Sequence, residues 1–159
     1  MNPRIEHLSP KTLVGMRRTM TFATMNPAIL WSAFMPRKQE IPLMVGTDLY
    51  SLEVYPHNFF ASMSIDAEFD KWAAVEVSEN QYVPDGMETL SVQEGMYAVF
   101  VHYGPASEAK ATYDAIFRTW LPASGYLLDD RPHFAVMGAK YRHNDPQSEE
   151  EIWIPVRKN

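Results

Sequence analysis

The order of the expected secondary-structure elements constrains this chain most, because one order of strands and helices occurs twice along it. A loosely alternating segment at 4–20 predicts a first strand. Asn26 followed by Pro27 predicts a helix start, since asparagine favours the N-cap and proline favours the first helical position. Period-two alternation then predicts strands at 48–56 and 69–79. The first half is therefore a strand, a helix and two strands.

The second half follows the same order after a connection at 80–95 that is rich in turn residues. A strand is expected at 96–104, and apolar residues at helical spacing predict a helix from about 106 to 121. Strands at 133–142 and 150–156 complete this half. Because short connections between strands imply antiparallel pairing, we expect an α+β fold. It would have two pseudo-symmetric βαββ (SH2-like) repeats forming one antiparallel sheet, helices packed on that sheet and a ligand cleft between the halves.

Length and composition bound the number of domains and exclude several kinds of site. The 159 residues predict a single domain over 1–159, with repeat one at about 1–80 and repeat two at about 95–159. The absence of cysteine excludes a disulfide framework and thiolate metal ligands. The five histidines lack metal-ligand spacing, and no glycine-rich phosphate loop is present, so we expect neither a metal nor a cofactor.

Charge and hydropathy bound the partners and the location. A net charge of −6 argues against a nucleic-acid surface, so no direct nucleic-acid partner is expected. No apolar run approaches the roughly 20 residues of a membrane span, and the amino-terminal segment lacks a secretory pattern. We therefore expect a cytoplasmic protein without membrane contact. An acidic balance with 13% aromatic residues and 10 methionines favours an aromatic or cationic small molecule as partner.

Several short strings occur in a characteristic order over nearly the whole chain. They are LW..F (Leu30, Trp31, Phe34), Y.LEVY (50–55), FDKWAAVEVSE (69–79), VFVHYGP (99–105), WLPASGY (120–126), RPHFAV (131–136) and EIWIPV (151–156). As a spaced set they resemble the GyrI-like small-molecule-binding superfamily. Members of this superfamily include effector-binding domains of AraC-type and MerR-type multidrug regulators, and free-standing proteins of similar size.

The resemblance implies two βαββ units in one antiparallel sheet, with a ligand groove between them. In the family this groove is often lined by aromatic residues and holds a buried acid that takes lipophilic cations. The family's acid in the last strand falls on Glu151, with Trp153 at the aromatic position beside it. Many members carry a second glutamate where this chain has Ala135. The counterpart of Ala135 in the first half is Glu53, which offers a substitute.

Strand alternation separates the three consecutive acids at the start of the last strand. Glu151 shares a face with Trp153, opposite Ile152, which favours a groove position for both. The alternative is a solvated strand end, and that is the simplest interpretation of Glu149 and Glu150. A carboxylate beside an indole in an apolar groove attracts a cation or acquires a raised pKa.

Four more residues are candidates for ligand binding, each with a structural alternative. Trp72 occupies a place equivalent to that of Trp153 and would form a facing wall, or else pack in the core. Glu53 and Tyr55 share one face of their strand, as a groove acid and a stacking surface, or as ordinary strand residues. Trp31 lies on the apolar stripe of the first helix, where core packing is the alternative.

Three functions remain open at this stage. The leading one is a stand-alone multidrug-type binding protein for amphipathic cationic or aromatic compounds, with no catalytic residue. The resemblance also allows a GyrI-like hydrolase of cyclopropanoid electrophiles, in which Glu151 would act as the general base. A third function is binding to gyrase or to a regulator. A protein partner and a homodimer both stay open.

Overall fold

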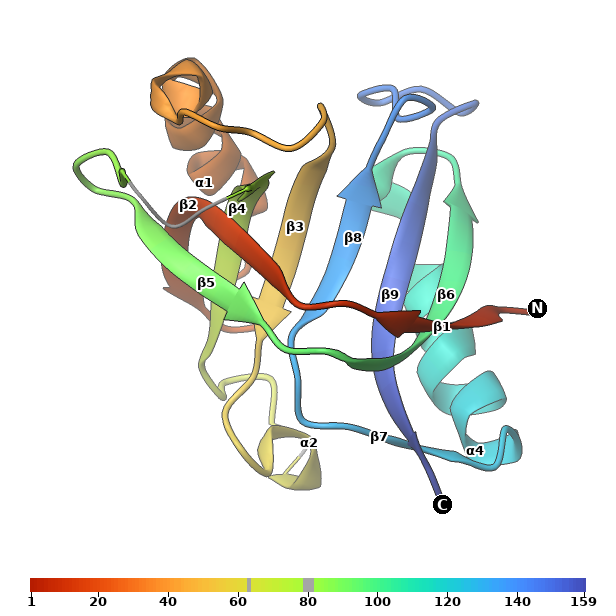
Figure 1. Ribbon diagram of the computed structural model, residues 1–159. Coiled ribbons are helices and arrows are strands. Elements are labelled where there is room, and N and C mark those ends of the chain that lie inside the picture. Colours follow the sequence, from red (N-terminus) through yellow and green to blue (C-terminus); the bar gives the residue numbers. More distant parts are fainter. Residues whose placement is uncertain (63, 79–81) are drawn as a thin grey trace.

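Two similar sets of elements make up the protein, as the computed structural model in Figure 1 shows; it describes residues 1–62, 64–78 and 82–159. The first set is β2 (Lys11–Met20), α1 (Pro27–Phe34), β3 (Leu49–Val54) and β4 (Phe69–Val77). The second set is β6 (Gly95–Tyr103), α3 (Lys110–Ala115), β8 (His133–Met137) and β9 (Glu149–Lys158). Each set runs strand, helix, strand, strand, which confirms the expected α+β class and its doubled order.

Shorter elements surround these two sets. The additional strands and α-helices are β1 (Arg4–Leu8), α2 (Phe59–Ser62), β5 (Glu88–Val92), α4 (Leu121–Ala123) and β7 (Tyr126–Leu128). A 3₁₀ helix at Met35–Glu40 extends α1. A 3₁₀ turn at Ala106–Glu108 precedes α3, and a π-helical turn at Ile116–Trp120 follows it.

Four expectations about these elements were wrong. The strand expected at 133–142 ends at Met137, before a turn. The segment 4–20 forms two strands, separated at Ser9 and Pro10, because proline has no N–H for a strand ladder. The region 80–95 contains β5 and is more than a connection. The helix expected at 106–121 is broken into four short helical segments. Glu79, the expected end of the strand at 69–79, lies outside the described residues.

Within the described residues, nine strands form one antiparallel sheet. The strand that precedes each set, β1 or β5, pairs with the other half, and we call this the exchange of first strands. The order is β1-β6-β9-β8-β3-β4-β2-β5, and β7 pairs with β9 outside this path. The halves meet at β3 and β8, where Leu52 lies opposite Phe134. β1, which precedes β2 in the chain, pairs with β6 of the second half, and β5, which precedes β6, pairs with β2 of the first. Figure 1 shows β1 and β5 crossing in front of the central strands.

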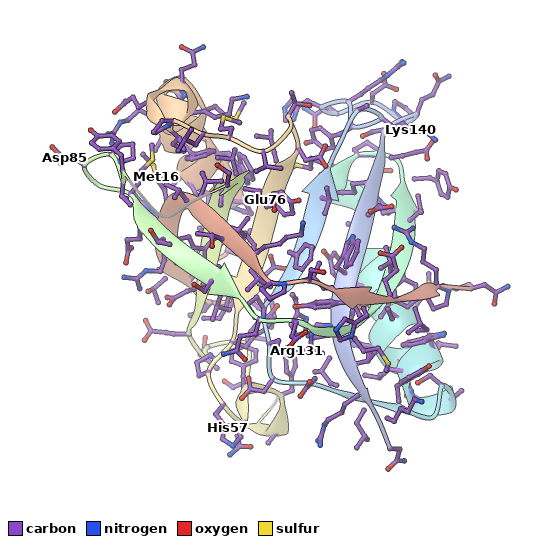
Figure 2. The ribbon with its side chains drawn as sticks, in the orientation of Figure 1. Met16, His57, Glu76, Asp85, Arg131 and Lys140 are labelled. Atoms are coloured by element: carbon purple, nitrogen blue, oxygen red, sulfur yellow. The ribbon has the colours of Figure 1, made fainter. Side chains whose placement is uncertain are left out.

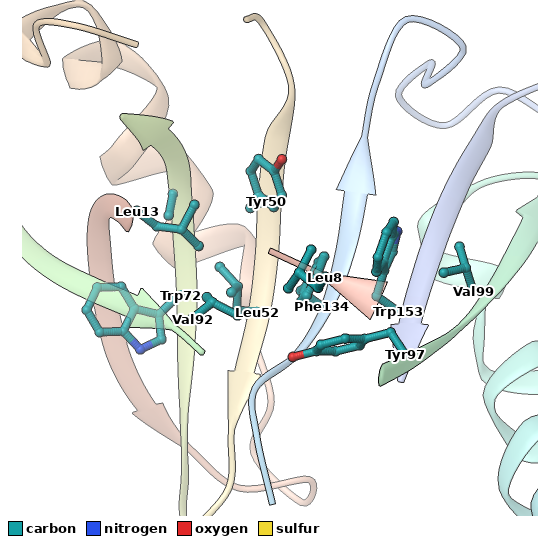
Figure 3. Packing of buried hydrophobic residues seen from close by; sticks show 11 residues of the cluster. Leu8, Leu13, Tyr50, Leu52, Trp72, Val92, Tyr97, Val99, Phe134 and Trp153 are labelled. Atoms are coloured by element: carbon teal, nitrogen blue, oxygen red, sulfur yellow. The ribbon is translucent and has the colours of Figure 1, made fainter. Parts of the chain in front are cut away.

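The two faces of the central sheet are covered differently. We call the face crossed by β1 and β5 the front face, and the face against which α1 and α3 pack the helix face. Front-face side chains of both halves form one shared core, in which Leu52, Trp72, Phe134 and Trp153 lie together (Figure 3). On the helix face each half has its own core. The buried polar side chains described below lie on the helix face, between these two cores.

The pairing register confirms the expected equivalence of Trp72 and Trp153. Trp72 lies opposite Leu52 in the first half, and Trp153 lies opposite Phe134 in the second. Figure 3 shows the two indoles toward opposite ends of the shared core. They are therefore pseudo-symmetric core residues on the same face, as strand alternation predicts.

The tightest backbone approach lies at Gly15 in the middle of β2. A Cβ added there would collide with the carbonyl oxygen of Ala73 and would lie 2.6 Å from the Cα of Ala74. We predict that Gly15→Ala lowers the free energy of unfolding by about 2 kcal/mol or more, because the backbone of β4 cannot yield without losing its ladder. Urea unfolding measures this change. The control is Gly138→Ala, where a Cβ would meet only the Asp48 side chain at 3.3 Å.

Candidate functional site

Buried polar side chains gather on the helix face, between the two half-cores. Six of the described residues are polar or charged and buried, and one of these, Ser148, lies outside the strands and has its hydroxyl bonded to the backbone N–H of Arg142. The other five come from β3, β4, β6, β8 and β9, and strand alternation directs all of them to the helix face. These five, Glu53, Lys71, His102, His133 and Glu150, together with Tyr55, Phe60, Tyr113 and Phe117, are called the helix-face cluster below.

Glu53 and Lys71 form a buried ion pair in this cluster. They lie opposite each other on β3 and β4, and the Lys71 Nζ donates to Glu53 Oε2 at 2.8 Å. Both residues are nearly inaccessible, with exposed fractions of 7% and 6%. A buried carboxylate and a buried ammonium are each costly alone and compensate each other as a pair. The charge of Glu53 is therefore matched within the protein.

Glu150 is a second buried carboxylate, and no ion pair or hydrogen bond to its side chain occurs in the described part of the chain. It is 6% exposed. Burial raises the pKa of Glu150, and the nearby charge of Glu53 raises it further, while His102 and Lys71 act in the opposite direction. Three neighbours thus influence its charge, but none of them pairs with it directly.

Neither histidine of the cluster forms an ion pair with Glu150 within the described residues. The His102 Nε2 faces the carbonyl oxygen of Pro105 at 2.9 Å, and its Nδ1 faces the hydroxyl of Thr112 at 2.8 Å. Because a carbonyl can only accept, Nε2 carries a proton, and both ring nitrogens of His102 are engaged away from Glu150. Burial lowers the pKa of His133 to about 3, so this ring is neutral at pH 7.

Aromatic rings surround the buried acids. Phe60, Phe117 and His133 stack in one group, with ring centroids 5.7 to 6.1 Å apart. Tyr55 meets the His133 ring edge-on, with centroids 4.9 Å apart. Tyr113 of α3 lies close enough to both carboxylates that Glu53 and Glu150 raise the pKa of its hydroxyl, after the larger effect of burial. Phe60 reaches this group from α2, so both halves and their connections contribute.

The helix-face cluster is therefore an aromatic environment with one buried acid that forms no ion pair within the described residues. Lys71 pairs with Glu53, His133 is neutral at pH 7, and His102 and Lys71 influence Glu150 without pairing with it. Buried ionisable groups with shifted pKa values are more frequent at functional sites than elsewhere. Such an arrangement can hold a cation with an apolar surface, or it can hold a proton on Glu150.

A groove of about 390 Å³ lies on the opposite, front face, and it contains two of the residues expected in the ligand site. Glu151 and Trp153 of β9 line it, beside Tyr50 of β3 and Glu76 of β4. Figure 2 labels Glu76 near the upper part of β3. The remaining lining residues come from β1, the β1–β2 connection, the start of β2, the residue before β3, and β8: Glu6, His7, Leu8, Ser9, Pro10, Lys11, Asp48, Phe134 and Val136.

Comparison with known proteins assigns the chain to a family. Residues 1–157 match the GyrI-like small molecule binding domain. The protein belongs to the GyrI-like family. As a GyrI-like domain it is a small-molecule-binding domain related to the effector-binding domains of transcriptional regulators.

Relatives of this GyrI-like domain include regulators and a ligand-bound protein. The transcriptional regulator BrlR of Pseudomonas aeruginosa is 27% identical over 158 residues, which cover 98% of this chain and 56% of BrlR. The chain thus spans about half the length of that relative. The structure of SAV2435 bound to tetraphenylphosphonium matches with a TM-score of 0.74 at 18% identity, covering 99% of this chain and 94% of that one. EcmrR, in a complex with DNA, matches with a TM-score of 0.72 at 14% identity, covering 99% and 58%.

The GyrI-like domain separates the expected site residues between its two faces. Glu53 and Tyr55 share the helix face, as expected, while Glu151 and Trp153 share the front face and lie across the sheet from them. Trp72 is buried in the shared core and is not among the residues that line the groove. Trp31 packs edge-on against Phe34 of its own helix, with ring centroids 5.9 Å apart, at the margin of the first half-core.

The expectation that Glu150 is solvated was wrong, because β9 begins one residue before it. Glu150 lies opposite His102 of β6 and is covered on the helix face, while Glu149 stays half-buried beside Lys140. Strand alternation already placed Glu150 on the same face as the core residue Ile152, so the sequence pattern was consistent with a buried Glu150. Glu76 was likewise on the Trp72 face in the sequence pattern, but nothing there indicated a groove.

Two features of the described residues concern metals and membranes. No group of three histidine, cysteine, aspartate or glutamate side chains in the described part of the chain is placed to hold a metal ion. Among the helices that the structure describes, none has the length and apolar character needed to cross a membrane.

The raised pKa of Glu150 predicts how its replacement changes stability with pH. A carboxyl whose pKa is raised on folding favours the folded state when protonated and disfavours it when ionised. The wild-type free energy of unfolding therefore falls as pH rises through the ordinary glutamate pKa of about 4.3 toward the folded value. Glu150→Gln removes this loss, so the variant should be more stable than wild type at pH 7 and lose that advantage below about pH 4.

Urea unfolding at pH 7 and pH 4 measures both effects. Glu151→Gln is the matched control, since it changes the adjacent residue in the same way but on the other face. It removes an exposed ion pair with Arg4 and should lower stability at pH 7 by no more than about 1 kcal/mol. A stability of Glu150→Gln below that of wild type at pH 7 would contradict this account of Glu150.

Proposed function

We propose that this GyrI-like domain binds lipophilic organic cations at the helix-face cluster, with Glu150 as the counter-charge. The observation that carries the proposal is a buried carboxylate that has no ion pair or hydrogen bond to its side chain within the described residues. An ionised carboxylate taken out of water without a partner is strongly disfavoured. A bound cation supplies the missing partner, so binding relieves a cost that the free protein already bears.

The rings of the cluster suit the apolar part of such a ligand. Tyr55, Phe60, Tyr113 and Phe117 are half-buried around the acids, so their faces are partly available. Contact between a cation and an aromatic face contributes on the order of 0.5–2 kcal/mol. Because these rings border the acids closely, binding of a large cation requires some of them to move aside.

The second acid of the cluster has a different role in this proposal. Glu53 is held by Lys71 at 2.8 Å, and we infer that it raises the affinity of the site through its field, without contacting the ligand as its sole counter-charge. Ala135, which carries no charge, lies in the equivalent place of the second half, opposite Ile152 of β9. In this proposal Glu150 of β9 is the counter-charge to the ligand, in place of the neighbouring Glu151 that the sequence predicts for this role.

A structural relative supports the choice of ligand class. SAV2435 shares this fold and was solved with tetraphenylphosphonium, a lipophilic cation. EcmrR, which carries a domain of this fold in a longer chain, was solved in a complex with DNA. We infer that sensing of an organic cation, for a separate or attached DNA-binding partner, is the role of this chain.

The hydrolase, the gyrase- or regulator-binding protein and the homodimer remain alternative hypotheses. A hydrolase would need a free carboxylate as general base, and Glu151 is engaged by Arg4 and by the indole of Trp153. Binding to gyrase or a regulator, and homodimerisation, stay predictions.

The adjacent acids of β9 provide a sharp test of the site. We expect Glu150→Gln to weaken the binding of tetraphenylphosphonium about tenfold or more, since one counter-charge is lost. Binding of neutral triphenylphosphine oxide should change by less than about threefold, because its contacts are apolar. Isothermal titration calorimetry gives both dissociation constants. In wild type the affinity for the cation should also fall as pH drops and Glu150 is protonated.

Glu151→Gln is the control for position and charge. This variant removes one negative charge from the same strand but from the opposite face, so tetraphenylphosphonium should bind to it about as tightly as to wild type. The proposal fails if Glu151→Gln weakens the cation while Glu150→Gln does not. Equal weakening of the cation and the neutral phosphine oxide in Glu150→Gln would show that the carboxylate does not act as a counter-charge.

A further inference from the structure

We propose that the Lys71–Glu53 pair restricts the helix-face cluster to ligands with a single positive charge, and that Lys71 is the residue that sets this specificity. The inference rests on the proposed function, because it names the charge of the cation that the cluster takes. A lipophilic ligand with two positive charges would find no acid for the second charge and would meet the ammonium of Lys71.

The charges of the cluster leave at most one negative charge for a ligand. Two carboxylates, Glu53 and Glu150, share one ammonium, and the Lys71 Nζ lies 2.8 Å from Glu53 Oε2. Burial, followed by the field of Glu53, raises the pKa of Tyr55 and of Tyr113 well above its usual value, so both hydroxyls stay neutral. Histidine carries no negative charge in either protonation state. Within the cluster, only Glu150 can then balance a charge on the ligand.

Lys71 is the cation that compensates Glu53 among its neighbours in the sheet. The pairing register places Glu53 between Lys71 of β4 and His133 of β8. Because burial lowers the pKa of His133 to about 3, that ring is neutral at pH 7 and offsets no charge. The negative charge of Glu53 is thus offset by Lys71 and is not available to a second cationic group.

Lys71 cannot withdraw from the cluster to make room for another cation. β4 lies inside the sheet, between β3 and β2, and the Lys71 side chain is 8% exposed. On the same face, two residues before and two residues after it, Phe69 and Ala73 are buried in the core of the first half. A lysine at the surface can turn its ammonium into water, but this side chain is enclosed. The ammonium therefore stays in place when a ligand enters.

A second basic residue adds to the repulsion on this side of the cluster. Arg18 of β2 lies opposite Lys71, and strand alternation puts it on the helix face with Met16 and Met20. Its side chain is exposed. The helix face is therefore polarised, with Glu150 on the side of the second half and two basic residues on the side of the first.

The pair lies close enough to Glu150 to act on a ligand bound there. Beyond burial, which raises the pKa of Glu150, His102 and Lys71 lower it and Glu53 raises it. A cation beside Glu150 consequently lies in the field of Lys71. Glu150 compensates one positive charge, whereas Lys71 repels a second charge fixed to the same ligand, and burial makes this repulsion stronger than it would be in water. Specificity of this kind depends on an unfavourable contact with the wrong ligand.

The test compares two flat cations of the same shape that differ by one charge. The first is methyl viologen, which carries two positive charges. The second is its singly charged analogue, in which a tolyl ring replaces one N-methylpyridinium ring. Isothermal titration calorimetry gives both dissociation constants. We expect wild type to bind the singly charged probe about tenfold more tightly than methyl viologen, and Lys71→Met to narrow this ratio to about threefold or less.

Two further variants control for charge and for folding. Glu53→Gln/Lys71→Met removes both charges of the pair, so the cluster keeps one acid and the selectivity should equal that of wild type. Replacing a buried ion pair by uncharged residues commonly leaves stability unchanged or raises it. Glu53→Gln alone leaves the ammonium without its partner, so it should bind the singly charged probe about tenfold more weakly than the double variant does, and methyl viologen more weakly still.

Lys11→Met is the matched control for the position of the charge. Lys11 also pairs with a glutamate of the sheet, Glu76, at 3.1 Å, but it lines the front-face groove. Its replacement changes the net charge equally, and the selectivity should stay at the wild-type value.

The outcomes separate this inference from the proposed function. Wild-type selectivity in Lys71→Met would overturn the inference alone, and so would a loss of selectivity in Lys11→Met with none in Lys71→Met. If Lys71→Met does not fold, equal affinity of the singly charged probe for Glu53→Gln and for the double variant overturns it. Binding of that probe that is unchanged in Glu150→Gln would overturn the proposed function and, with it, this inference.

Discussion

The exchange of first strands between the two halves is the constraint on which the remaining structure depends. β1 leaves the first half to pair with β6, and β5 leaves the second half to pair with β2. Without this exchange the halves would meet only through β3 and β8 within the sheet. Leu8 and Val92, carried by the exchanged strands, complete the core that covers Phe134 and Trp153. The exchange therefore joins the two halves and contributes side chains from both exchanged strands to the shared core of the front face.

The same exchange explains why the two faces differ in chemistry. On the front face β1 brings Arg4 to Glu151 of β9, and β2 brings Lys11 to Glu76 of β4. On the helix face each half has its own apolar core, and the two cores are separate. The buried ionisable residues occupy the seam between the halves, where Glu53, Lys71 and Glu150 converge. One strand, β9, serves both faces because alternate residues point in opposite directions.

Strand alternation and the doubled order were enough to predict the class of fold. They also predicted that Glu53 and Tyr55 share a face, and that Trp72 and Trp153 are equivalent. Pairing between distant strands was not predictable, because β1 and β5 are short and their partners lie in the other half. The split at Pro10 shows how one residue without an N–H changes the count of strands.

The site was predicted only in part, for a related reason. The pattern separated Glu150 from Glu151 by face, but it did not show which face is open and which is covered. Glu150 was expected to be solvated at the start of the strand, whereas its pairing with His102 and its burial place it inside. Tyr113 appeared in the helical spacing as a packing residue. Its position beside both acids depends on how α3 docks, which no local pattern encodes.

The central claim is that an organic cation binds beside Glu150 on the helix face. The most direct measurement is the set of intermolecular nuclear Overhauser effects between the phenyl protons of bound tetraphenylphosphonium and assigned aromatic side chains. The account predicts contacts to Tyr113 and Phe117, which border the buried acids. Contacts to Trp153 and Tyr50, with none to Tyr113 or Phe117, would place the cation in the front groove and contradict the account.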